Sequence, residues 1–466
     1  MFEKLIKKTA RVKSGLKIVI VGCGKVGGTL VEQLSKEGHD IVLVDRSAER
    51  LHALTDIYDV MGVVGNGASF STLSEAGIED ADMIIAVTDS DELNLLTCTV
   101  ARREGNCTAI ARVRNPEYSQ EIGYLQERLG LAMIINPDKE AANEIARVLS
   151  LPAALGVNTF AHGLAEMVRV KIPEGNVLCN KSLAGLGRDI RNILICAVER
   201  GNDVCIPTGN FVLQEGDIIT FLASTKEATV FLEDIGIQTN RIRHAILIGG
   251  GRSAYYLAKQ LMEVGVHVKI IEKDKARSEE LSILLPNAIV LNADGTETAV
   301  LKEAGMEQVD AFIPLTGIDE ENILLTLHAK EVSKAKVITK INRINFHGVI
   351  NRLELGSVIY PKYIVAEAII AYVRALTASK DSSNVETLYH LFDYRTEAIE
   401  FHIKGESDLT NKPLKDLKLK DNVLIGCINR DGHIIIPGGN DCIKPNDSVI
   451  IVTTHTGFDD IREILK

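Results

Sequence analysis

Short runs of consecutive apolar residues, many of them β-branched, alternate with helical patterns in the first part of the chain. The runs occupy residues 18–21, 41–44, 60–64, 83–87, 108–113 and 133–135. Because they lack polar alternation, they are typical of strands buried on both faces, which belong to parallel sheets covered by crossover helices. The pattern therefore predicts an α/β fold with a Rossmann-like, doubly wound parallel sheet.

The same pattern occurs twice. Residues 17–27 (KIVIVGCGKVG) return as residues 244–254 (HAILIGGGRSA), 227 positions later. Residues 75–82 and 88–94 return as 303–310 and 316–322, and residues 200–210 return as 430–440. These offsets are close to half of the 466-residue chain. The sequence therefore predicts a tandem duplication.

Each half has a second, smaller part in which short strands alternate with turns rich in Gly, Asn, Asp and Pro. We expect a small α+β module there, joined to the Rossmann-like sheet by a helix that begins at Pro137 or Pro361. The expected organisation is a basic extension at residues 1–16, Rossmann-like domains at 17–140 and 242–365, and small modules at 155–237 and 385–466.

A glycine loop follows the first strand of each Rossmann-like domain. In the first copy, Gly22 permits a tight turn, Gly24 lets a pyrophosphate approach the backbone, and Gly27 lets the next helix lie close to the sheet. The amides at the start of that helix then face the phosphates. Asp45 ends the second strand, where an acid accepts hydrogen bonds from the adenosine ribose hydroxyls. The loop predicts NAD(H) or an adenosine di- or triphosphate, with NADP(H) disfavoured.

Other polar residues lie near this predicted site, and each has two interpretations. Lys25 contacts a phosphate or faces solvent, and Arg252 takes its place in the second copy. Thr88 and Asp89 line the ligand site or cap the next helix. Arg112, with Lys340 as its counterpart, contacts phosphate or a neighbouring subunit, or forms a surface ion pair.

The second loop differs at three positions, with Ala254 for Gly27, Glu272 for Asp45 and Gly317 for Asp89. Alanine is tolerated at the third glycine position, so the second pocket is expected to bind, with a different ligand or affinity. In the small modules Arg200, Asp217 and their counterparts Arg430 and Asp447 are expected to hold turns, with an effector site as the alternative.

Composition narrows the class of function. Lys and Arg total 52 against 63 Asp and Glu, a net charge of −11, which disfavours nucleic acid as a partner. The eight cysteines and the isolated histidines show no metal, disulfide or catalytic spacing. No apolar run approaches the length of a bilayer span, and residues 1–16 lack a signal-peptide core. We therefore expect a cytoplasmic protein, whose basic first residues are a solvated tail or contact an anionic membrane or a partner.

The order of domains and several motifs together resemble the TrkA family, the peripheral regulatory subunits of bacterial Trk potassium uptake systems, whose domains are also called RCK or KTN. The motifs are residues 22–30 (GCGKVGGTL), 75–77 (EAG), 81–82 (AD) and 88–92 (TDSDE), together with Asp45. The resemblance covers residues 17–466, and the basic segment before Lys17 departs from the family's usual start.

The resemblance implies a non-enzymatic protein that binds NAD(H) or ATP and ADP and forms a homo-oligomeric ring, expected to be a tetramer. The ring would lie on the inner face of the membrane, against a potassium-translocating subunit of the TrkH type. The implied ligand residues of the first site are Gly22, Cys23, Gly24, Lys25, Val26, Gly27, Asp45, Thr88, Asp89 and Arg112. Those of the second are Gly249, Gly250, Gly251, Arg252, Ser253, Glu272, Thr316 and Lys340.

Two other functions stay open at this stage. The first is regulation of a different cation transporter, since similar modules serve such systems. The second is an NAD-dependent oxidoreductase, which is disfavoured because no catalytic domain accompanies either Rossmann-like unit.

Overall fold

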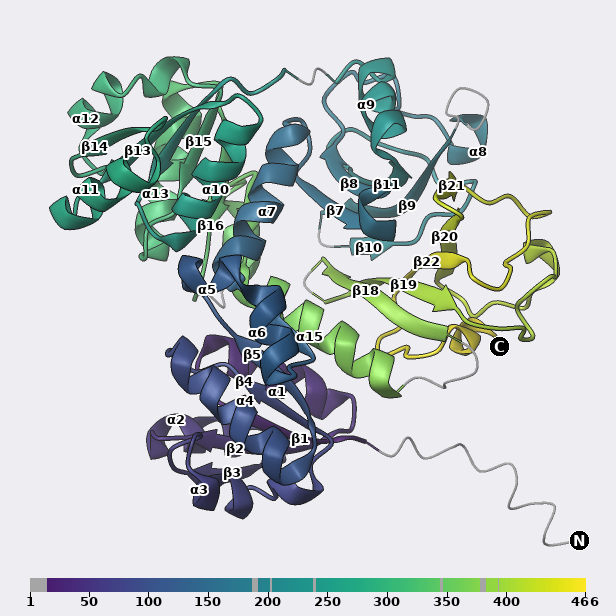
Figure 1. The fold of residues 1–466 in the computed structure, drawn as a ribbon. Helices are drawn as coiled ribbons and strands as arrows, with labels where there is room; N and C mark the ends of the chain where they lie inside the picture. The colour runs from purple at the N-terminus through teal and green to yellow at the C-terminus, as the bar shows by residue number, and fades with distance from the viewer. Residues whose placement is uncertain are drawn as a thin grey trace, which may run out of the picture. The chain divides into compact units, whose positions relative to one another are not determined.

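A computed structural model describes residues 15–186, 192–201, 203–237, 240–343, 347–377, 383–392 and 394–466 (Figure 1). The chain divides into two compact units, residues 1–137 and 138–466. Most of the basic segment at residues 1–16 lies outside the described residues.

The first unit holds a six-stranded parallel sheet with the strand order β3-β2-β1-β4-β5-β6. This is the order of a doubly wound nucleotide-binding sheet, so the predicted fold class is confirmed. The strands are β1 (Lys17–Val21), β2 (Asp40–Asp45), β3 (Met61–Val64), β4 (Met83–Ala86), β5 (Thr108–Arg112) and β6 (Met133–Ile135). The helices are α1 (Lys25–Lys36), α2 (Ala48–Thr55), α3 (Phe70–Glu75), α4 (Asp91–Gly105), α5 (Pro116–Gln120) and α6 (Ile122–Leu129).

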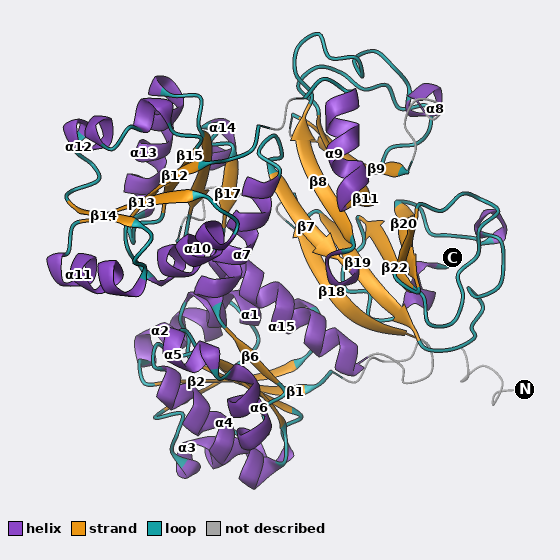
Figure 2. Ribbon diagram, turned by 45° about the horizontal axis from the view of Figure 1, so that its top comes forward, coloured by secondary structure: helices purple, strands orange, loops and turns teal. Residues whose placement is uncertain are grey.

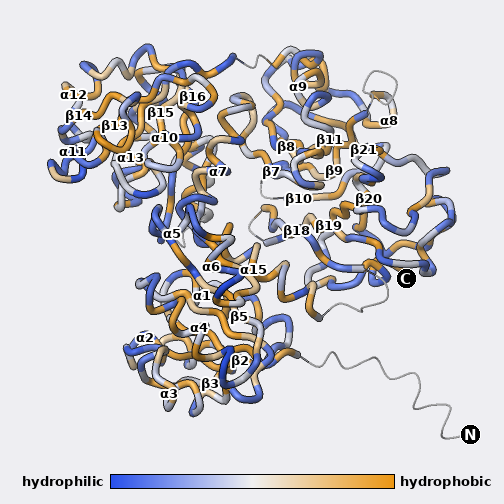
Figure 3. The backbone as a smooth tube through the Cα atoms, in the orientation of Figure 1, coloured by the Kyte–Doolittle hydropathy of each residue, from blue (hydrophilic) through white to orange (hydrophobic). Residues whose placement is uncertain are grey.

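The second unit holds a matching sheet with the order β14-β13-β12-β15-β16-β17. Its strands are β12 (His244–Ile248), β13 (His267–Glu272), β14 (Ile289–Asn292), β15 (Ala311–Pro314), β16 (Lys336–Lys340) and β17 (Ser357–Ile359). Its helices are α10 (Arg252–Glu263), α11 (Lys275–Leu284), α12 (Thr298–Glu303), α13 (Asp319–Val332) and α14 (His347–Arg352). Hydrophobic residues follow the strands of both sheets, as their continuous apolar runs require (Figure 3).

Two five-stranded antiparallel sheets, also in the second unit, form the small modules. One contains β7 (Gly156–Phe160), β8 (Ala165–Lys171), β9 (Ile193–Arg200), β10 (Asp203–Cys205) and β11 (Ile218–Ser224), with α8 (Leu183–Leu186) and α9 (Thr225–Asp234). The other contains β18 (Ser383–Leu391), β19 (Thr396–Ile403), β20 (Val423–Arg430), β21 (His433–Ile435) and β22 (Ser448–Thr453).

The two small modules share a hydrophobic core, and their sheets lie beside one another (Figure 2). Phe160 of the first module packs edge-to-face on Tyr389 of the second, with ring centroids 5.1 Å apart. The Tyr389 hydroxyl donates to the carbonyl of Thr159, and the Ala161 amide donates to the Glu400 carboxylate at 2.9 Å. Because buried polar atoms need partners, these bonds fix how the two modules pair.

The repeated arginines of the small modules hold turns. Arg200 donates two hydrogen bonds of 2.7 Å to Asp217, whose carboxylate also accepts from the backbone of Gln214. Arg430 and Asp447 repeat this bidentate pair at 2.8 and 2.7 Å. Both aspartates are 1% exposed and fully engaged with their own hairpins, so the structure favours the turn role over an effector site.

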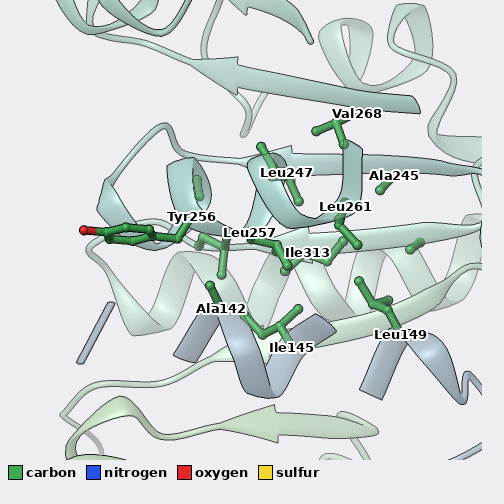
Figure 4. Close-up of a cluster of buried hydrophobic side chains, with 14 of the residues drawn as sticks. Ala142, Ile145, Leu149, Ala245, Leu247, Tyr256, Leu257, Leu261, Val268 and Ile313 are labelled. Atoms are coloured by element: carbon green, nitrogen blue, oxygen red, sulfur yellow. The ribbon is translucent and has the colours of Figure 1, made fainter. Parts of the chain in front are cut away.

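The helix α7 (Pro137–Ser150) connects the first sheet to the first module, and α15 (Pro361–Thr377) connects the second sheet to the second module. Both begin at the proline that the sequence indicated. Within the second unit, α7 packs on α10: Ala142, Ile145 and Leu149 face Leu257 and Leu261 in a shared core (Figure 4). A helix from the first half therefore covers the second Rossmann-like domain.

Candidate functional site

The first glycine loop runs from the end of β1 to the start of α1. Gly22 has φ +110°, a conformation that favours glycine, and its amide donates to the carbonyl of Val44. Gly24 has extended backbone and precedes α1 without a side-chain cap, so the first amides of the helix are left for a ligand. Lys25 is exposed at the first helical position, and Val26 is buried beside it.

The three glycines meet different surroundings. A Cβ at Gly27 would lie 1.9 Å from the carbonyl oxygen of Gly22, so a side chain there collides with the loop itself. A Cβ at Gly24 would meet no protein atom within 4 Å. The absence of a side chain at Gly24 therefore serves no packing need within the described residues, and it leaves an open cradle in front of the helix amides.

The acid at the end of β2 supports this loop. One carboxylate oxygen of Asp45 accepts from the amide of Cys23 at 2.7 Å, and the other accepts from the amide of Ser47 at 2.8 Å. Each oxygen keeps a second lone pair for a ribose hydroxyl. The acid is thus held in place by the backbone at the loop where a nucleotide would lie.

A second group of polar residues lies at the carboxyl ends of β4 and β5. The side-chain amide of Asn94 donates to the carbonyls of Thr88 and Arg112 at 3.1 and 2.9 Å, and its oxygen accepts from Thr88. Asn94 is fully buried and joins the two strand ends. The repeat placed it inside a recurring motif, but our sequence interpretation gave it no role; its recurrence as Asn322 was the available signal.

The structure decides between two of the alternatives left open by the sequence. The N-cap of α4 is Ser90, whose hydroxyl accepts from the amide of Leu93 at 3.1 Å, so the capping role considered for Thr88 and Asp89 is wrong. Arg112 forms the ion pair considered for it, with Asp89 at 3.1 Å, and the Arg112 side chain is 9% exposed whereas that of Asp89 is 87% exposed. Burial and the charge of Arg114 lower the pKa of Arg112, while Asp89 opposes that shift.

The second glycine loop has the same geometry, although Glu272 replaces Asp45 and Gly250 replaces Cys23. Gly249 has φ +92°, and Gly251 again leaves open space where a Cβ would be. Glu272 is one methylene longer than Asp45, and it accepts from the amide of Gly250 at 2.5 Å. A Cβ at Gly250 would lie 2.4 Å from a methyl group of Leu281 and 3.0 Å from the Glu272 carboxylate, so the second copy has little room for a side chain where the first has Cys23.

The carboxyl ends of β15 and β16 repeat the arrangement of the first site. Asn322 donates to the carbonyls of Thr316 and Lys340 at 3.2 and 2.9 Å, as Asn94 does in the first copy. The Lys340 ammonium donates to the carbonyl of Leu315 at 2.7 Å. Arg252 is exposed at the first position of α10, and Ser253 is buried after it. In both copies the structure thus brings the sequence-predicted residues together at the carboxyl edge of the sheet.

Cys23 lies within the first loop, but its thiol is poorly suited to react. The side chain is 8% exposed, and burial together with the charge of Asp45 raises its pKa to about 12. A free cysteine has a pKa of about 8.5 and therefore holds roughly 3000-fold more thiolate at neutral pH. We expect iodoacetamide at pH 7.5 to label Cys23 at least about tenfold more slowly than the partly exposed Cys442, measured by peptide mass spectrometry. Equal labelling rates would contradict the buried position.

The groups at this site can bind a ligand in two ways. Backbone amides can donate to phosphates, and carboxylate oxygens can accept from ribose hydroxyls. Among the described residues, no group of three or more His, Cys, Asp or Glu side chains is placed to hold a metal ion. In the same part of the chain, every helix is too short or too polar to cross a lipid bilayer.

Comparisons with known proteins agree with this arrangement. The sequence matches the TrkA-N domain family over residues 18–137 and 245–361, and the TrkA-C domain family over residues 167–236 and 398–466. The Trk system potassium uptake protein TrkA of Haemophilus influenzae is 32% identical over 444 residues, covering 94% of this chain and 95% of that protein. The protein of the same name from Vibrio alginolyticus is 32% identical over 448 residues, covering 95% and 97%.

Solved structures with the same fold include the GsuK channel bound to NAD, with a TM-score of 0.61 and 18% identity, covering 97% of this chain and 80% of that one. The GsuK RCK domain gives a TM-score of 0.60 at 18% identity and covers 95% of this chain and 93% of its own length. At this level of identity the similarity establishes the fold.

Proposed function

Because the chain belongs to the TrkA family of potassium uptake proteins, we propose that it is a regulatory subunit that binds adenine nucleotides and gates a potassium-translocating membrane protein. The proposal depends mainly on the two glycine loops. Each has open space at Gly24 or its counterpart Gly251, in front of helix amides that no side chain caps. In each, a carboxylate at the end of the next strand accepts a hydrogen bond from the loop backbone. Phosphates bind such helix starts through backbone amides and the helix dipole.

The proposed ligands are NAD(H), ADP and ATP, all of which present adenosine ribose hydroxyls and phosphates. The GsuK channel, which shares the fold, has been solved bound to NAD and to ADP. We propose that residues 22–27 with Asp45, Thr88, Asp89 and Arg112 line the first site. Residues 249–253 with Glu272, Thr316 and Lys340 line the second.

Gating requires that the ligand bind one arrangement of the subunits more tightly than another. A coupling of about 1–3 kcal/mol per site changes the relevant affinity roughly 5- to 150-fold, and two sites in each chain multiply the effect. We propose that the chains assemble into a tetrameric ring on the cytoplasmic face of the membrane, against a TrkH-type subunit. Nucleotide binding at the glycine loops would change the arrangement of the subunits in the ring, and this change would be transmitted to the pore of the membrane subunit.

We propose that this protein is not an enzyme. Within the residues that the structure describes, each Rossmann-like sheet is followed by a connecting helix and a small antiparallel module. The buried side chains of Asn94 and Asn322 at the two sheet edges hold strand ends together. Phosphate cradles that are lined by backbone amides suit recognition of a ligand rather than its conversion.

The experiment is potassium flux through proteoliposomes that contain the membrane subunit with and without this protein. We expect ATP, ADP and NADH to change the flux at least about fivefold between the activating and the inhibiting ligand, and only when the protein is present. A flux that ignores all three nucleotides would contradict the proposal. Co-purification with a cation exchanger in place of a potassium pore would redirect it to another transporter.

A further inference from the structure

The second glycine loop has a carboxylate beside it that comes from a different part of the fold. Asp138, in the first turn of α7, accepts a hydrogen bond of 2.7 Å from the hydroxyl of Ser253. Ser253 is the second residue of α10, is 3% exposed, and lies two positions after the open cradle at Gly251. The amide of Ser253 is among those that would face a bound phosphate.

This carboxylate is held in place by the packing of α7. The side-chain amide of Gln260 in α10 donates to Asn143 in α7 at 2.6 Å, one or two turns from the loop. Ile145 and Leu149 of α7 then pack on α10 in the shared core (Figure 4). These contacts further along the two helices place Asp138 at the start of α10, where it accepts from Ser253.

The contact has no equivalent in the first loop's own sequence. The position of Ser253 is taken there by Val26, which has no hydroxyl to hold a carboxylate. The exposed cations match, with Lys25 in one copy and Arg252 in the other. The hydroxyl-tethered acid is therefore an addition to the second site.

A fixed negative charge beside a phosphate cradle penalises each further negative charge on the ligand. The Asp138 carboxylate lies 2.7 Å from the Ser253 hydroxyl, so a phosphate held by the amide of the same residue would lie within the roughly 10 Å over which charges interact at moderate salt. We propose that Asp138 is a specificity-determining residue of the second site and selects ligands with few phosphate charges. AMP and NAD would then be favoured over ATP. This inference rests on the proposed nucleotide binding.

The test measures the ratio of dissociation constants for ATP and AMP at the second site, by calorimetry in the presence of EDTA. All variants are made in the full chain with Gly24→Ala, so that the first loop does not bind nucleotide and contributes no heat. Asp138→Asn keeps an acceptor for Ser253 and removes the charge. We expect it to tighten ATP binding by about tenfold relative to AMP, whereas Asp138→Glu keeps the original ratio.

Glu140→Gln provides the matched control, since it removes one charge from the same helix further from the loop, where Glu140 accepts from Asn143 at 3.1 Å. It should change the ratio by less than about twofold. Because the readout is a ratio, a general loss of folded protein does not imitate the effect.

Three results would overturn the inference. An unchanged ratio in Asp138→Asn would remove the carboxylate from ligand selection while leaving nucleotide binding intact. Weaker Mg-ATP binding by this variant, measured with magnesium in place of EDTA, would assign the carboxylate to a cation. Absence of nucleotide binding by every variant and by the unmodified chain would defeat the proposed function, and this inference with it.

Discussion

Gly24→Ala is expected to abolish nucleotide binding at the first site while the protein stays folded. A Cβ at Gly24 meets no protein atom within 4 Å, and the backbone there, with φ −77° and ψ −166°, accepts alanine without strain. The added methyl group would occupy the space of the phosphates. We expect a loss of more than about 100-fold in affinity, or roughly 3 kcal/mol, measured by calorimetry with NADH and ADP.

Gly251→Ala is the corresponding change in the second loop, where the backbone is also extended and the space is also open. Each variant should remove one of two binding events and leave the other. Gly27→Ala provides the contrast, because its Cβ would lie 1.9 Å from the Gly22 carbonyl oxygen. It should cost about 1–3 kcal/mol of stability. Full-strength binding by both Gly24→Ala and Gly251→Ala would refute the assignment of the cradles.

The second large effect is expected at a buried cluster of charges where α15 meets the second small module. Arg374 donates hydrogen bonds of 3.0 and 2.9 Å to Glu397, and the two side chains are 3% and 1% exposed. His390 lies between two carboxylates, with its ring nitrogens 3.3 Å from Glu397 and 3.5 Å from Glu367. The cluster links a connecting helix to two neighbouring strands, so it holds the module to its helix.

Glu397→Gln is expected to destabilise the second unit by about 3–5 kcal/mol, because it removes the carboxylate charge that faces the buried side chains of Arg374 and His390. Urea unfolding followed by circular dichroism measures the change. Glu354→Gln is the matched control, since Glu354 pairs with Lys171 at 3.1 Å on the surface, with side chains 72% and 52% exposed. The control should cost less than about 1 kcal/mol. Equal effects of the two variants would mean that the buried pair does not hold the module.

The same cluster predicts how stability depends on pH. Burial alone would lower the pKa of His390, but its bonds to Glu367 and Glu397 outweigh burial and raise it from 6.5 to about 9. A raised pKa stabilises the fold fully below pH 6.5, and the contribution, roughly 3 kcal/mol, is lost as the pH rises through 9. Burial would raise the pKa of Glu397, but His390 and Arg374 lower it to about 2. That contribution is present above pH 4.5 and is lost as the pH falls through 2.

His390→Gln should therefore remove most of the decline in unfolding free energy between pH 6.5 and 9. Urea unfolding of both proteins across this range is the measurement. A decline of the same size in the variant would show that another group is responsible.

The sequence predicted well those elements whose conformation is determined by residues close together in the chain. The buried strands, the prolines that begin α7 and α15, and the glycine loops each depend on a few adjacent residues. Strand ends differed by a single residue at Val60, Val87 and Val113, which lie just outside β3, β4 and β5. The duplication gave the second half the same strand order as the first, as the repeat predicted.

What the sequence did not reveal depends on contacts between distant segments. Asn94 matters because it joins the ends of β4 and β5, which hydropathy does not show. An amphipathic helix such as α7 shows that it has an apolar face, but not that the face covers α10 in the other half. For the same reason neither the contact of Asp138 with Ser253 nor the buried position of His390 could be predicted.

We expect each chain to hold two phosphate cradles that bind adenine nucleotides. Isothermal titration of the purified, unmodified protein with NADH, ADP and ATP measures the heat of binding and the number of sites. We expect heat of binding that fits two sites per chain, one of them lost in Gly24→Ala and the other in Gly251→Ala. No heat with any of the three nucleotides would contradict the account.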